Sequence, residues 1–591
     1  MVVTNEQLAD IFEKMATLLE IKGDSVFKIR AYQRAARTIE NLSVSLENSV
    51  RDKQDLKEIP GIGKAINDKI YEYVETGRIS AYDKLVEELP QGILTLMTVP
   101  SIGPKTAVLI ANELNVTSIE ELEQAILDDK VSGINGIGKK TAENILRNVQ
   151  ELRTKDRRTP IGVALPLAEM IIRKLQIACQ ELISLYPVGS LRRWEETIGD
   201  IDIVCISPNP TSISNALVGL EEVDDVLVQG DKKTSVVLES GVQLDLRMAD
   251  SQSLGAMLQY FTGSQQHNIR IREYANRKGL SVNEYGITDD NTGILEKFAD
   301  EESFYRRLGL QYVPPELRVG INEISMAEKQ MLPHLIEEND LKGDLHIHTD
   351  WSDGRDSMEE MIKIAADLGY EYIAITDHSA GLGVAHGLSI DRLESHINNL
   401  RNLQEKFSIR ILCGSEVDIR ADGSLDYPDE ILDKLDVVVA SIHSAMGQDS
   451  VRMTSRLKCA MNHKNVTMIG HLSTRIIGHR SPIDFDMEEI LLTAKSSGTA
   501  LELNSSPERL DLKDTHACLA KDFGIPLVLN TDSHNVHGFN NRRYGIAVAR
   551  RAWCEPKHVL NTLPLSKFID YISAPKTDRN DMFLANWPSG C

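Results

Sequence analysis

From residue 341 onward the sequence alternates short apolar runs with stretches of helical periodicity, and this alternation limits the folds open to it. Apolar runs separated by helical stretches are typical of β/α units, in which neighbouring strands pair in parallel. The expected strands are residues 343–347, 371–376, 409–416, 436–442, 466–470, 499–504 and 526–530. The pattern therefore predicts a closed parallel barrel in this part of the chain.

Residue types that bind metals recur at the ends of these expected strands. His346 and His348 alternate on the first run, so their imidazoles face the same side. The later runs end on or near Asp353, His378, Glu416, His443, His471, Asp532 and His534. A single histidine is more often structural, but a series at the carboxyl ends of barrel strands indicates a metal centre. Mixed imidazole and carboxylate ligands suit zinc, manganese or iron better than calcium.

A second group of acidic residues follows a Gly-Ser turn at residues 189–190. Asp200 and Asp202 occupy positions i and i+2 of an apolar run that is expected to be a strand, which places both carboxylates on one face. Asp245 lies in another strand-like run, 242–247. Carboxylates on a rigid strand beside a phosphate-binding turn can hold two hard cations for phosphoryl transfer. Two acids alone could equally be solvated residues of an edge strand.

Residues 1–155 are expected to be mostly helical and contain a degenerate repeat. It reads Ile-Pro-Gly-Ile-Gly-Lys at 59–64 and recurs at 99–105 and 134–140. Glycines at the start of a helix let backbone amides approach a phosphate without reading base sequence. An ordinary glycine turn explains one copy equally well, but three copies favour helix-hairpin-helix DNA binding. The expected DNA contacts are Gly61, Gly63, Gly103, Gly136 and Gly138.

Length and charge limit the class of protein. At 591 residues the chain is too long for one core, so several domains are expected. A net charge of −23 argues against a general nucleic-acid binder, so a DNA path would be local and built partly from backbone amides and bound cations. The seven scattered cysteines indicate reduced thiols, and no signal peptide or membrane-spanning run is evident. We expect a cytoplasmic monomer without membrane contact.

On these motifs, residues 1–318 resemble DNA polymerase family X, the polymerase beta type. The resemblance implies that Asp200, Asp202 and Asp245 are catalytic and hold two Mg²⁺ or Mn²⁺ ions. It also implies a set of residues that bind the incoming dNTP: Gly189, Ser190, Arg193, Gly199, Tyr260, Phe261, Gly263, Asn268 and Arg272. The string Tyr-Phe-Thr-Gly-Ser at 260–264 matches the sugar-checking turn of the family. Residue 243 is glutamine where polymerase beta has arginine, which could alter how the primer end is oriented.

The N-terminal segment also resembles the deoxyribose-phosphate lyase domain of that family. Lys69 falls where the Schiff-base lysine is found. A lysine on a hairpin helix is more often a solvated phosphate contact, and the other basic residues of the lyase pocket match only loosely. Both interpretations of Lys69 stay open.

Residues 341–575 resemble the PHP (polymerase and histidinol phosphatase) family, and the nine-ligand pattern of that family is complete. Mn²⁺, Zn²⁺ or Fe²⁺ would be bound there. The resemblance implies one metal on His346, His348, Glu416 and Asp532, a second on Glu416, His443 and His471, and a third on Asp353, His378 and His534. His386 is either a substrate contact or without a role, and Asp377 is expected to be structural. Arg475, Arg480, Arg542 and Arg543 are candidate phosphate contacts, although solvated charges are the commoner explanation.

The expected fold class is a multidomain α/β chain with a helical helix-hairpin-helix N-terminal region, an α+β nucleotidyltransferase palm and thumb, and a PHP-type (β/α) barrel. The expected domains are a lyase-like helical domain (1–85), helical fingers (86–158), palm (159–250), thumb (251–318), linker (319–340), PHP barrel (341–575) and C-terminal tail (576–591).

The expected function is a DNA-directed DNA polymerase that fills short gaps in DNA repair. Its substrates would be dNTPs and gapped or nicked duplex DNA. The PHP domain would process 3′ ends as a metal-dependent 3′-5′ exonuclease, or as a 3′-phosphatase or AP endonuclease. The alternative is a PHP small-molecule phosphoesterase with a DNA-binding module that lacks synthesis. A catalytically inactive scaffold is disfavoured by the two complete ligand sets.

Overall fold

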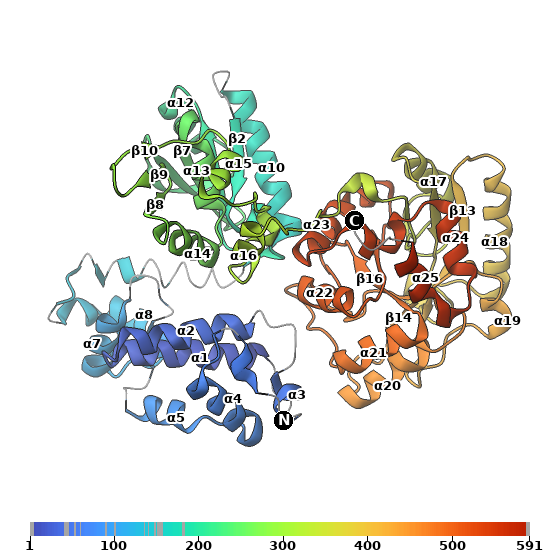
Figure 1. The fold of residues 1–591 in the computed structure, drawn as a ribbon, viewed down its shortest axis with the longest axis horizontal. Coiled ribbons are helices and arrows are strands. Elements are labelled where there is room, and N and C mark those ends of the chain that lie inside the picture. The colour runs from blue at the N-terminus through green and yellow to red at the C-terminus, as the bar shows by residue number, and fades with distance from the viewer. Residues whose placement is uncertain are drawn as a thin grey trace. The chain divides into compact units, whose positions relative to one another are not determined.

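The computed structural model describes residues 5–40, 46–51, 55–59, 61–88, 92–97, 102–134, 158–179 and 184–586, with shorter stretches between residues 99 and 149. The chain forms two compact units, Met1–Arg158 and Thr159–Cys591. In Figure 1 the first unit is blue to cyan and the second runs from teal to red.

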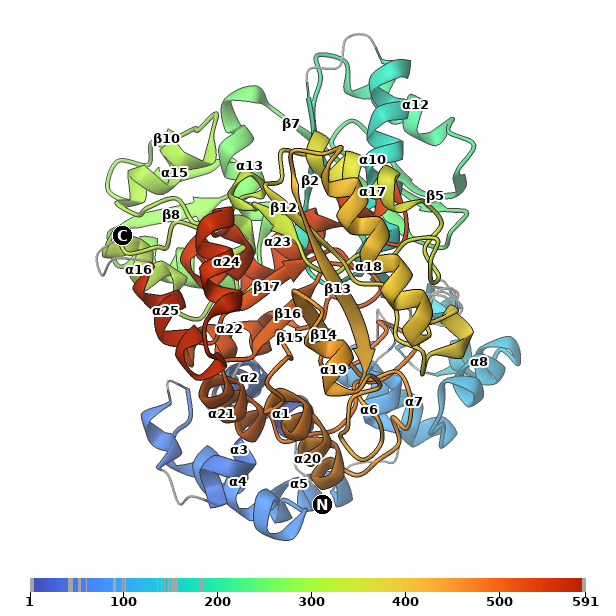
Figure 2. The same ribbon diagram turned by 90° about the vertical axis from the view of Figure 1, so that its right-hand side faces the viewer.

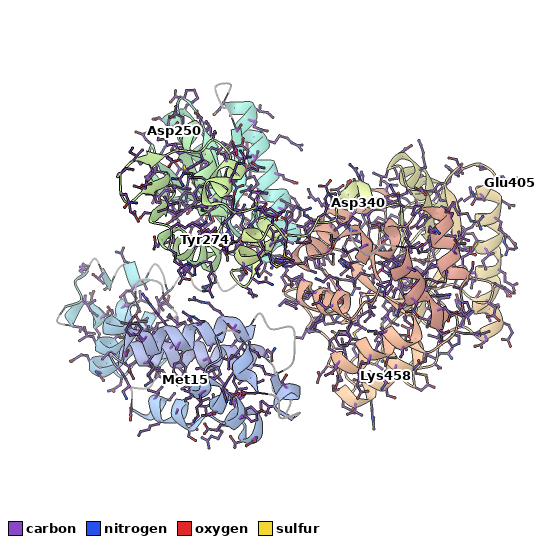
Figure 3. The ribbon with its side chains drawn as sticks, viewed as in Figure 1. Met15, Asp250, Tyr274, Asp340, Glu405 and Lys458 are labelled. Atoms are coloured by element: carbon purple, nitrogen blue, oxygen red, sulfur yellow. The ribbon has the colours of Figure 1, made fainter. Side chains whose placement is uncertain are left out.

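The N-terminal unit is helical, as the sequence predicts. In the first helix, Leu8, Phe12 and Met15 recur at helical spacing and are buried. Phe12 packs against Tyr32 of the second helix, with ring centroids 6.0 Å apart, and Met15 is labelled in Figure 3. The helices are α1 (Asn5–Ile21), α2 (Val26–Glu40), α3 (Leu46–Arg51), α4 (Lys64–Thr76), α5 (Ser80–Glu87), α6 (Ile93–Leu96), α7 (Pro104–Leu114) and α8 (Ile119–Leu127), with 3-10 turns η1 (Leu56–Glu58) and η2 (Val131–Gly133).

The predicted palm contains a five-stranded sheet in the order β2-β4-β7-β6-β5. Strand β4 pairs in parallel with β7, and the other neighbours are antiparallel. Ile201, Ile203 and Val204 of β4 are fully buried, so the apolar run of the sequence forms a central strand. The palm elements are β1 (Thr159–Pro160), α10 (Ile161–Ala178), β2 (Ser184–Val188), α11 (Gly189–Arg192), β3 (Thr197–Ile198), β4 (Ile201–Ile206), α12 (Pro210–Val218), β5 (Val223–Gln229), β6 (Lys233–Leu238) and β7 (Gln243–Ala249).

The thumb combines helices with a small antiparallel sheet, ordered β10-β9-β8. Its centre holds a buried arginine, Arg318, whose Nη1 lies 2.7 Å from Glu301 and whose guanidinium lies over the rings of Tyr305 and Tyr312. The thumb and connector elements are η3 (Ser251–Ser253), α13 (Leu254–Thr262), α14 (Gln265–Asn276), β8 (Leu280–Asn283), β9 (Gly286–Asp289), β10 (Leu295–Glu296), α15 (Glu301–Leu308), η4 (Pro315–Leu317), α16 (Glu323–Glu328) and η5 (Glu338–Asp340).

The C-terminal part contains seven parallel strands in sequential order, β11 to β17 (Figure 2). A parallel bridge between Ile347 and Ser533 joins the first strand region to the last, which closes the ring. All seven strands overlap predicted ones: β11 (Gly343–Asp344), β12 (Tyr372–Ile375), β13 (Arg410–Asp418), β14 (Val437–Ser441), β15 (Met468–Ile469), β16 (Ala500–Asn504) and β17 (Leu527–Asn530). Strand β11 ends at Asp344, so His346 and His348 follow the strand and do not lie on it as the sequence predicts.

Side chains alternate between two cores along these strands. Ile373 and Ile375 belong to the core that the outer helices cover, whereas Tyr372 packs with the helices that follow the last strand and stacks on Phe568 at 4.5 Å. Figure 3 labels Lys458 of α20, which pairs on the surface with Glu489 of α21. The helices are α17 (Met358–Asp367), α18 (Ile390–Gln404), α19 (Asp429–Leu432), α20 (Ser450–Met461), α21 (Met487–Ser497), α22 (Asp514–Asp522), α23 (Arg542–Arg551), α24 (Leu565–Ser573) and α25 (Arg579–Ala585), with 3-10 turns η6 (Gly383–Ala385), η7 (Val536–Asn541), η8 (Pro556–His558), η9 (Leu560–Thr562) and η10 (Lys576–Asp578).

The palm, the thumb and the barrel share one unit, and their contacts are partly ionic. One buried apolar core contains residues of both palm and barrel. Arginines of the barrel side reach acceptors in the palm and thumb: Arg475 to Glu196, Arg543 to Glu169, Arg550 to Glu316 and Arg551 to the carbonyl of Arg193. Since Arg475 and Arg543 are held in these pairs, and Arg542 pairs with Glu338, their positions give no support to the predicted phosphate contacts.

Some elements differ from the sequence expectations. The predicted connector 319–340 contains α16 and η5, and the predicted tail contains α25, whose Phe583 is buried. The predicted helix near 166–184 begins earlier, at Ile161. None of the helices in the described part of the chain combines the length and apolar character that crossing a membrane requires.

Candidate active sites and DNA interface

The palm brings together the three predicted carboxylates. Asp202 of β4 is the direct neighbour of Asp245 on β7. Asp200 precedes the strand, because β4 begins at Ile201, so the expectation that both acids lie on the strand holds only for Asp202. Gly189 has φ +66°, and a Cβ at this position would lie 2.8 Å from Oδ2 of Asp202. The turn therefore requires glycine in order to pass so close to the carboxylate.

The two strand carboxylates have unlike electrostatic surroundings. Burial, followed by the charges of Asp245 and Asp200, raises the pKa of Asp202 to about 6. Burial acts in the same direction on Asp245, but hydrogen bonds from Lys233, Ser235 and Gln243 outweigh it and lower that pKa. Mutual repulsion of buried carboxylates is what a divalent cation relieves, so these residues fit the expected metals. Below about pH 6, protons would compete with a cation for Asp202.

Gln243, where the resemblance expects arginine, contacts the carboxylate group directly. Its Nε2 donates to Oδ1 of Asp245 at 3.0 Å, and Nζ of Lys233 lies 2.7 Å from the other oxygen. Lys233 thus supplies a positive charge beside Asp245, which keeps its carboxylate ionised.

The predicted nucleotide-binding residues meet at the end of α13. Arg193 donates to the carbonyl of Thr262, and its Nε lies 3.1 Å from Glu195. Gly263 has φ +68°, and a Cβ there would lie 3.1 Å from Nη1 of Arg193. The structure therefore joins the predicted phosphate-binding arginine to the predicted sugar-checking turn. Ser190 lies on the same short helix α11 that begins at Gly189, and Gly199 is exposed directly before Asp200.

The aromatic turn itself is held by cationic and polar neighbours. Tyr260 and Phe261 pack edge to face with ring centroids 5.1 Å apart. The guanidinium of Arg247 lies 4.4 Å from the ring of Phe261, and that of Arg272 lies 5.9 Å from the ring of Tyr260. Asn268 donates to the carbonyl of Tyr260 at 2.7 Å. These contacts bring Asn268 and Arg272 to the turn.

The barrel gathers the nine predicted ligands into one cluster, with Glu416, which is 1% exposed, at its centre. Glu416 sits on β13, and its carboxylate oxygens lie 2.9–3.5 Å from ring nitrogens of His346, His348, His378, His443 and His471. Asp532 is 3.2 Å from His348 and 3.6 Å from His346. Asp353 is 3.4 Å from both His378 and His534.

Ligand atoms in this cluster are close enough to share cations. In each of three groups the candidate ligand atoms lie within 4.8 Å of one another. The groups are His346, His348 and Glu416; His378, Glu416 and His443; and His348, Asp353, His378 and His534. These groups overlap with the predicted ligand sets but differ in two ways. His348 also joins the predicted set of Asp353, His378 and His534, and His378 also joins Glu416 and His443.

Several buried ring nitrogens in the cluster have no hydrogen-bond partner. They are Nε2 of His346, both nitrogens of His348 and Nδ1 of His471. A buried nitrogen without a partner carries a free-energy cost that metal coordination would remove. The donor set therefore fits transition-metal ions.

The charges of the cluster are strongly coupled. Burial, together with His534 and His378, lowers the pKa of His348 to about 4. Burial opposes protonation of His378 as well, but Glu416 and Asp353 outweigh it and raise that pKa to about 10. Despite their own burial, Glu416 and Asp532 have pKa values well below the usual range because histidines surround them. The carboxylates are therefore ionised and available to cations.

Three further carboxylates outside the predicted ligand sets support the ligands, and one of them, Asp377, is the residue that the sequence analysis expects to be structural. Oδ1 of Asp418 lies 3.1 Å from Nδ1 of His443. Asp377 accepts from the backbone amide of Thr349 and pairs with His396, which orders the loop before Asp353. Oε1 of Glu502 lies 2.7 Å from Nδ1 of His346. The available signal for Glu502 was a charged residue inside an apolar strand run.

The glycine repeats form helix starts that face open space. Gly63 and Gly103 are the N-caps of α4 and α7, and neither helix has a side-chain cap. Gly61 and Gly136 have φ of +104° and +99°, and a Cβ on Gly63, Gly103, Gly136 or Gly138 would meet nothing within 4 Å. The isoleucine directly before Gly63, Gly103 or Gly138 is buried in each copy: Ile62, Ile102 and Ile137. Each isoleucine anchors its turn and leaves the helix amides accessible to a phosphate.

Comparison with known proteins gives the family. Family profiles match along the chain: a helix-hairpin-helix domain at residues 3–79, a SAM-like helix-hairpin-helix tandem at 93–151, a DNA polymerase beta thumb at 257–319 and a PHP domain at 344–506. The DNA polymerase/3′-5′ exonuclease PolX of Bacillus subtilis (strain 168) is 37% identical over 558 residues, which cover 94% of this chain and 97% of that protein. The chain belongs to the PolX family of DNA polymerases.

Other relatives of this PolX-family chain match it in part. A probable phosphatase of Thermoanaerobacter sp. (strain X514) is 31% identical over 247 residues, 39% of this chain and 95% of that protein. The repair DNA polymerase X of African swine fever virus (isolate Tick/South Africa/Pretoriuskop Pr4/1996) is 30% identical over 142 residues, 23% of this chain and 82% of that protein. The resemblance of the sequence to family X and to PHP proteins is thereby confirmed, as is the fold class.

Lys69 and His386 belong to neither ligand cluster. Nζ of Lys69 donates to the carbonyl of Ala65 at 3.2 Å and lies 5.9 Å from the ring of Tyr32. This placement suits either a phosphate contact or the expected lyase lysine. His386 is exposed, and its carbonyl accepts from Arg392.

Proposed function

We propose that this PolX-family protein fills short gaps in DNA with its palm and processes DNA 3′ ends with its PHP barrel as a metal-dependent 3′-5′ exonuclease. The observation that carries the proposal is the presence of two separate ligand clusters in one chain, the palm carboxylates and the nine-residue barrel cluster. The name of the Bacillus relative, DNA polymerase/3′-5′ exonuclease, agrees with both.

In the palm, Asp200, Asp202 and Asp245 would hold two Mg²⁺ or Mn²⁺ ions, which supply charge neutralisation for phosphoryl transfer. Asp245 is kept ionised by Lys233, so it can accept the proton of the primer 3′-hydroxyl. Arg193 lies at the same turn and offers a positive charge to the triphosphate of the incoming dNTP. The Tyr260–Phe261 turn would lie against its sugar.

In the barrel, the nine-residue cluster would hold Mn²⁺, Zn²⁺ or Fe²⁺, which supply Lewis acidity for hydrolysis of a phosphodiester. Glu416 lies between two of the ligand groups and would contribute to both. Asp418 orients His443 through Nδ1, so that Nε2 points to Glu416 at 3.3 Å. The same centre could serve a 3′-phosphate or an abasic site.

A small phosphomonoester is the second candidate substrate of the barrel. The Thermoanaerobacter relative, named a probable phosphatase, matches the chain over a length that corresponds to the barrel alone. Fusion to helix-hairpin-helix and polymerase regions favours a DNA end instead.

Primer extension on gapped duplex DNA tests the proposal. The wild-type protein should extend a primer with dNTPs and Mg²⁺ or Mn²⁺, and should trim a labelled 3′ end when Mn²⁺, Zn²⁺ or Fe²⁺ is supplied without dNTPs. A protein that hydrolyses small phosphomonoesters but leaves every DNA 3′ end intact would contradict the exonuclease half. Absence of extension on gapped DNA would contradict the polymerase half.

DNA binding by the hairpins should depend on salt and hardly on base sequence. If about four to six phosphates are contacted, affinity should fall on the order of 10²- to 10³-fold between 50 and 200 mM salt. Fluorescence anisotropy with duplexes of different sequence measures this. A strong sequence preference at fixed salt would contradict phosphate recognition.

A negative charge introduced at the first two of the three hairpins makes this test more specific. Gly63→Asp with Gly103→Asp should fit sterically, since a Cβ at either position meets nothing within 4 Å. Aspartate is a good N-cap, so the helices should keep their stability while the carboxylates repel DNA. Gly63→Asn with Gly103→Asn is the neutral control and should bind DNA more tightly than the aspartate pair.

A further inference from the structure

Glu502 lies in the middle of β16, is fully buried, and belongs to none of the predicted ligand sets. Its carboxylate accepts four hydrogen bonds from residues that adjoin the metal cluster. One oxygen accepts from Nδ1 of His346 at 2.7 Å and from Nδ2 of Asn530 at 2.9 Å. The other oxygen accepts from the backbone amide of His471 at 2.7 Å and from Nδ2 of Asn504 at 3.2 Å.

Three of these four donors cannot become acceptors. The amide oxygen of Asn530 accepts from the backbone N–H of Leu345 at 3.0 Å, so its NH₂ group must face Glu502. The amide oxygen of Asn504 accepts from the backbone N–H of Ser506 at 3.0 Å, which fixes that side chain in the same way. The third fixed donor is a backbone amide. These fixed donors require a side chain at position 502 that accepts hydrogen bonds on both of its oxygens. An ionised carboxylate is such a group.

The fourth partner, His346, is the one whose Nδ1 can either donate or accept a hydrogen bond. A neutral imidazole carries its proton on one nitrogen and accepts with the other. With the proton on Nδ1 and donated to Glu502, the bare Nε2 faces Glu416 at 3.4 Å and Asp532 at 3.6 Å. This Nε2 is one of the buried nitrogens without a hydrogen-bond partner. The tautomer that exposes a lone pair to the cluster is therefore the tautomer that Glu502 selects.

We propose that Glu502 is a positioning residue of the PHP site, which keeps the proton of His346 on Nδ1 so that Nε2 can coordinate a divalent cation. The inference rests on the proposed metal-dependent function of the barrel. Asn504 extends the arrangement, because its Nδ2 also lies 3.0 Å from Oδ2 of Asp532. The buried Glu502 carboxylate thus contacts His346 and the backbone amide of His471 directly. It contacts Asp532 indirectly, through the side-chain amide of Asn504.

Replacement by glutamine separates proton control from packing. Glutamine has nearly the shape of glutamate, but its NH₂ group must face one of the two donor pairs. On the side of His471 and Asn504 both donors are fixed. On the other side His346 can accept on Nδ1, provided that its proton moves to Nε2. We therefore expect the NH₂ group of the glutamine to face Nδ1 of His346. The Nε2 of His346 would then be protonated and would no longer bind a cation.

The test measures Mn²⁺ binding to chelator-treated full-length protein by competition with a fluorescent indicator. All variants carry Asp200→Ala and Asp202→Ala, so that the palm does not contribute. Glu502→Gln should weaken Mn²⁺ binding by about 10- to 100-fold. Glu502→Asp keeps an acceptor-only carboxylate and should bind Mn²⁺ more tightly than Glu502→Gln. A role in packing alone predicts the opposite order, because glutamine fills the space and aspartate leaves a cavity.

The connector helix α16 supplies a matched control. Glu323 is also fully buried and also lies 2.7 Å from Nδ1 of a histidine, His267. Glu323→Gln should leave Mn²⁺ binding unchanged, although it removes an equivalent buried charge. Circular dichroism melting of the metal-free proteins compares their folding. If Glu502→Gln does not fold, Glu502→Asp alone should still lose affinity relative to the parent, because its carboxylate is withdrawn from His346.

The outcomes separate the two proposals. A parent protein that binds no Mn²⁺ would remove the metal-dependent function and this inference together. A parent that binds Mn²⁺, with Glu502→Gln within threefold of it or tighter than Glu502→Asp, would overturn the role of Glu502 alone. An unchanged Glu502→Asp, where the glutamine variant does not fold, would also overturn it.

Discussion

Replacing Asp200 and Asp202 by alanine is expected to reduce nucleotide addition by at least about 10³-fold, while 3′-end trimming by the barrel continues. Asp202 lies beside Asp245 on paired strands, and the three carboxylates are the oxygen ligands of the palm. Without two of them the cations that neutralise the transferring phosphate are lost, and this stabilisation is worth several kcal/mol. A loss of about 4 kcal/mol corresponds to 10³ in rate.

Single-turnover primer extension on gapped DNA measures the effect, and a labelled 3′ end measures trimming in the same preparation. The control is Asp224→Ala with Asp225→Ala, two exposed carboxylates on β5 of the same sheet. These should leave extension unchanged. Normal extension by the Asp200 and Asp202 double variant would show that the palm assignment is wrong.

The second large effect is expected from His346→Ala, which should reduce 3′-5′ exonuclease activity by about 10²-fold or more and leave primer extension intact. His346 is fully buried, and its Nε2 faces both Glu416 and Asp532. Alanine removes one ligand and one of the four hydrogen-bond partners of the Glu502 carboxylate. Loss of a catalytic cation removes the Lewis acidity on which hydrolysis depends.

The assay follows trimming of a labelled 3′ end with Mn²⁺, alongside extension with Mg²⁺ and dNTPs. His537→Ala is the control, since His537 is exposed and lies only three residues beyond His534. Trimming at the wild-type rate by His346→Ala would refute the metal assignment. Loss of both activities would instead indicate a folding defect, which circular dichroism would detect.

The barrel was predictable because its strands are buried on both faces. A strand such as β14, Val437–Ser441, is a continuous apolar run between helices, and this signal is local. The palm was harder to read. Strand β5, Val223–Gln229, is partly exposed and carries Asp224 and Asp225 in its middle, so it lacks the apolar pattern. Strand β2 contains Pro187, which argues against a strand when the sequence is read alone.

The ligands of the barrel were predictable from residue type and position, because parallel strands bring their carboxyl ends to one edge. The residues that support the ligands were not. Glu502 reaches His346 across 156 positions of sequence, and nothing local to either residue reveals the pair. Arg475 was one candidate for a phosphate contact, but in the structure it pairs with Glu196 of the palm. Long-range ion pairs of this kind depend on tertiary packing.

The ionic contacts and the shared core between palm and barrel affect how the two activities can be studied separately. A cut through the connector would separate Arg475 from Glu196. Because Arg475 is only 9% exposed, this would leave a largely buried cation without its carboxylate partner. It would also expose apolar side chains that now belong to one core. Isolated halves would therefore be prone to aggregation, and a loss of activity after truncation would not identify which catalytic group was removed. Point substitutions in the intact chain are the sound way to assign each reaction to its site.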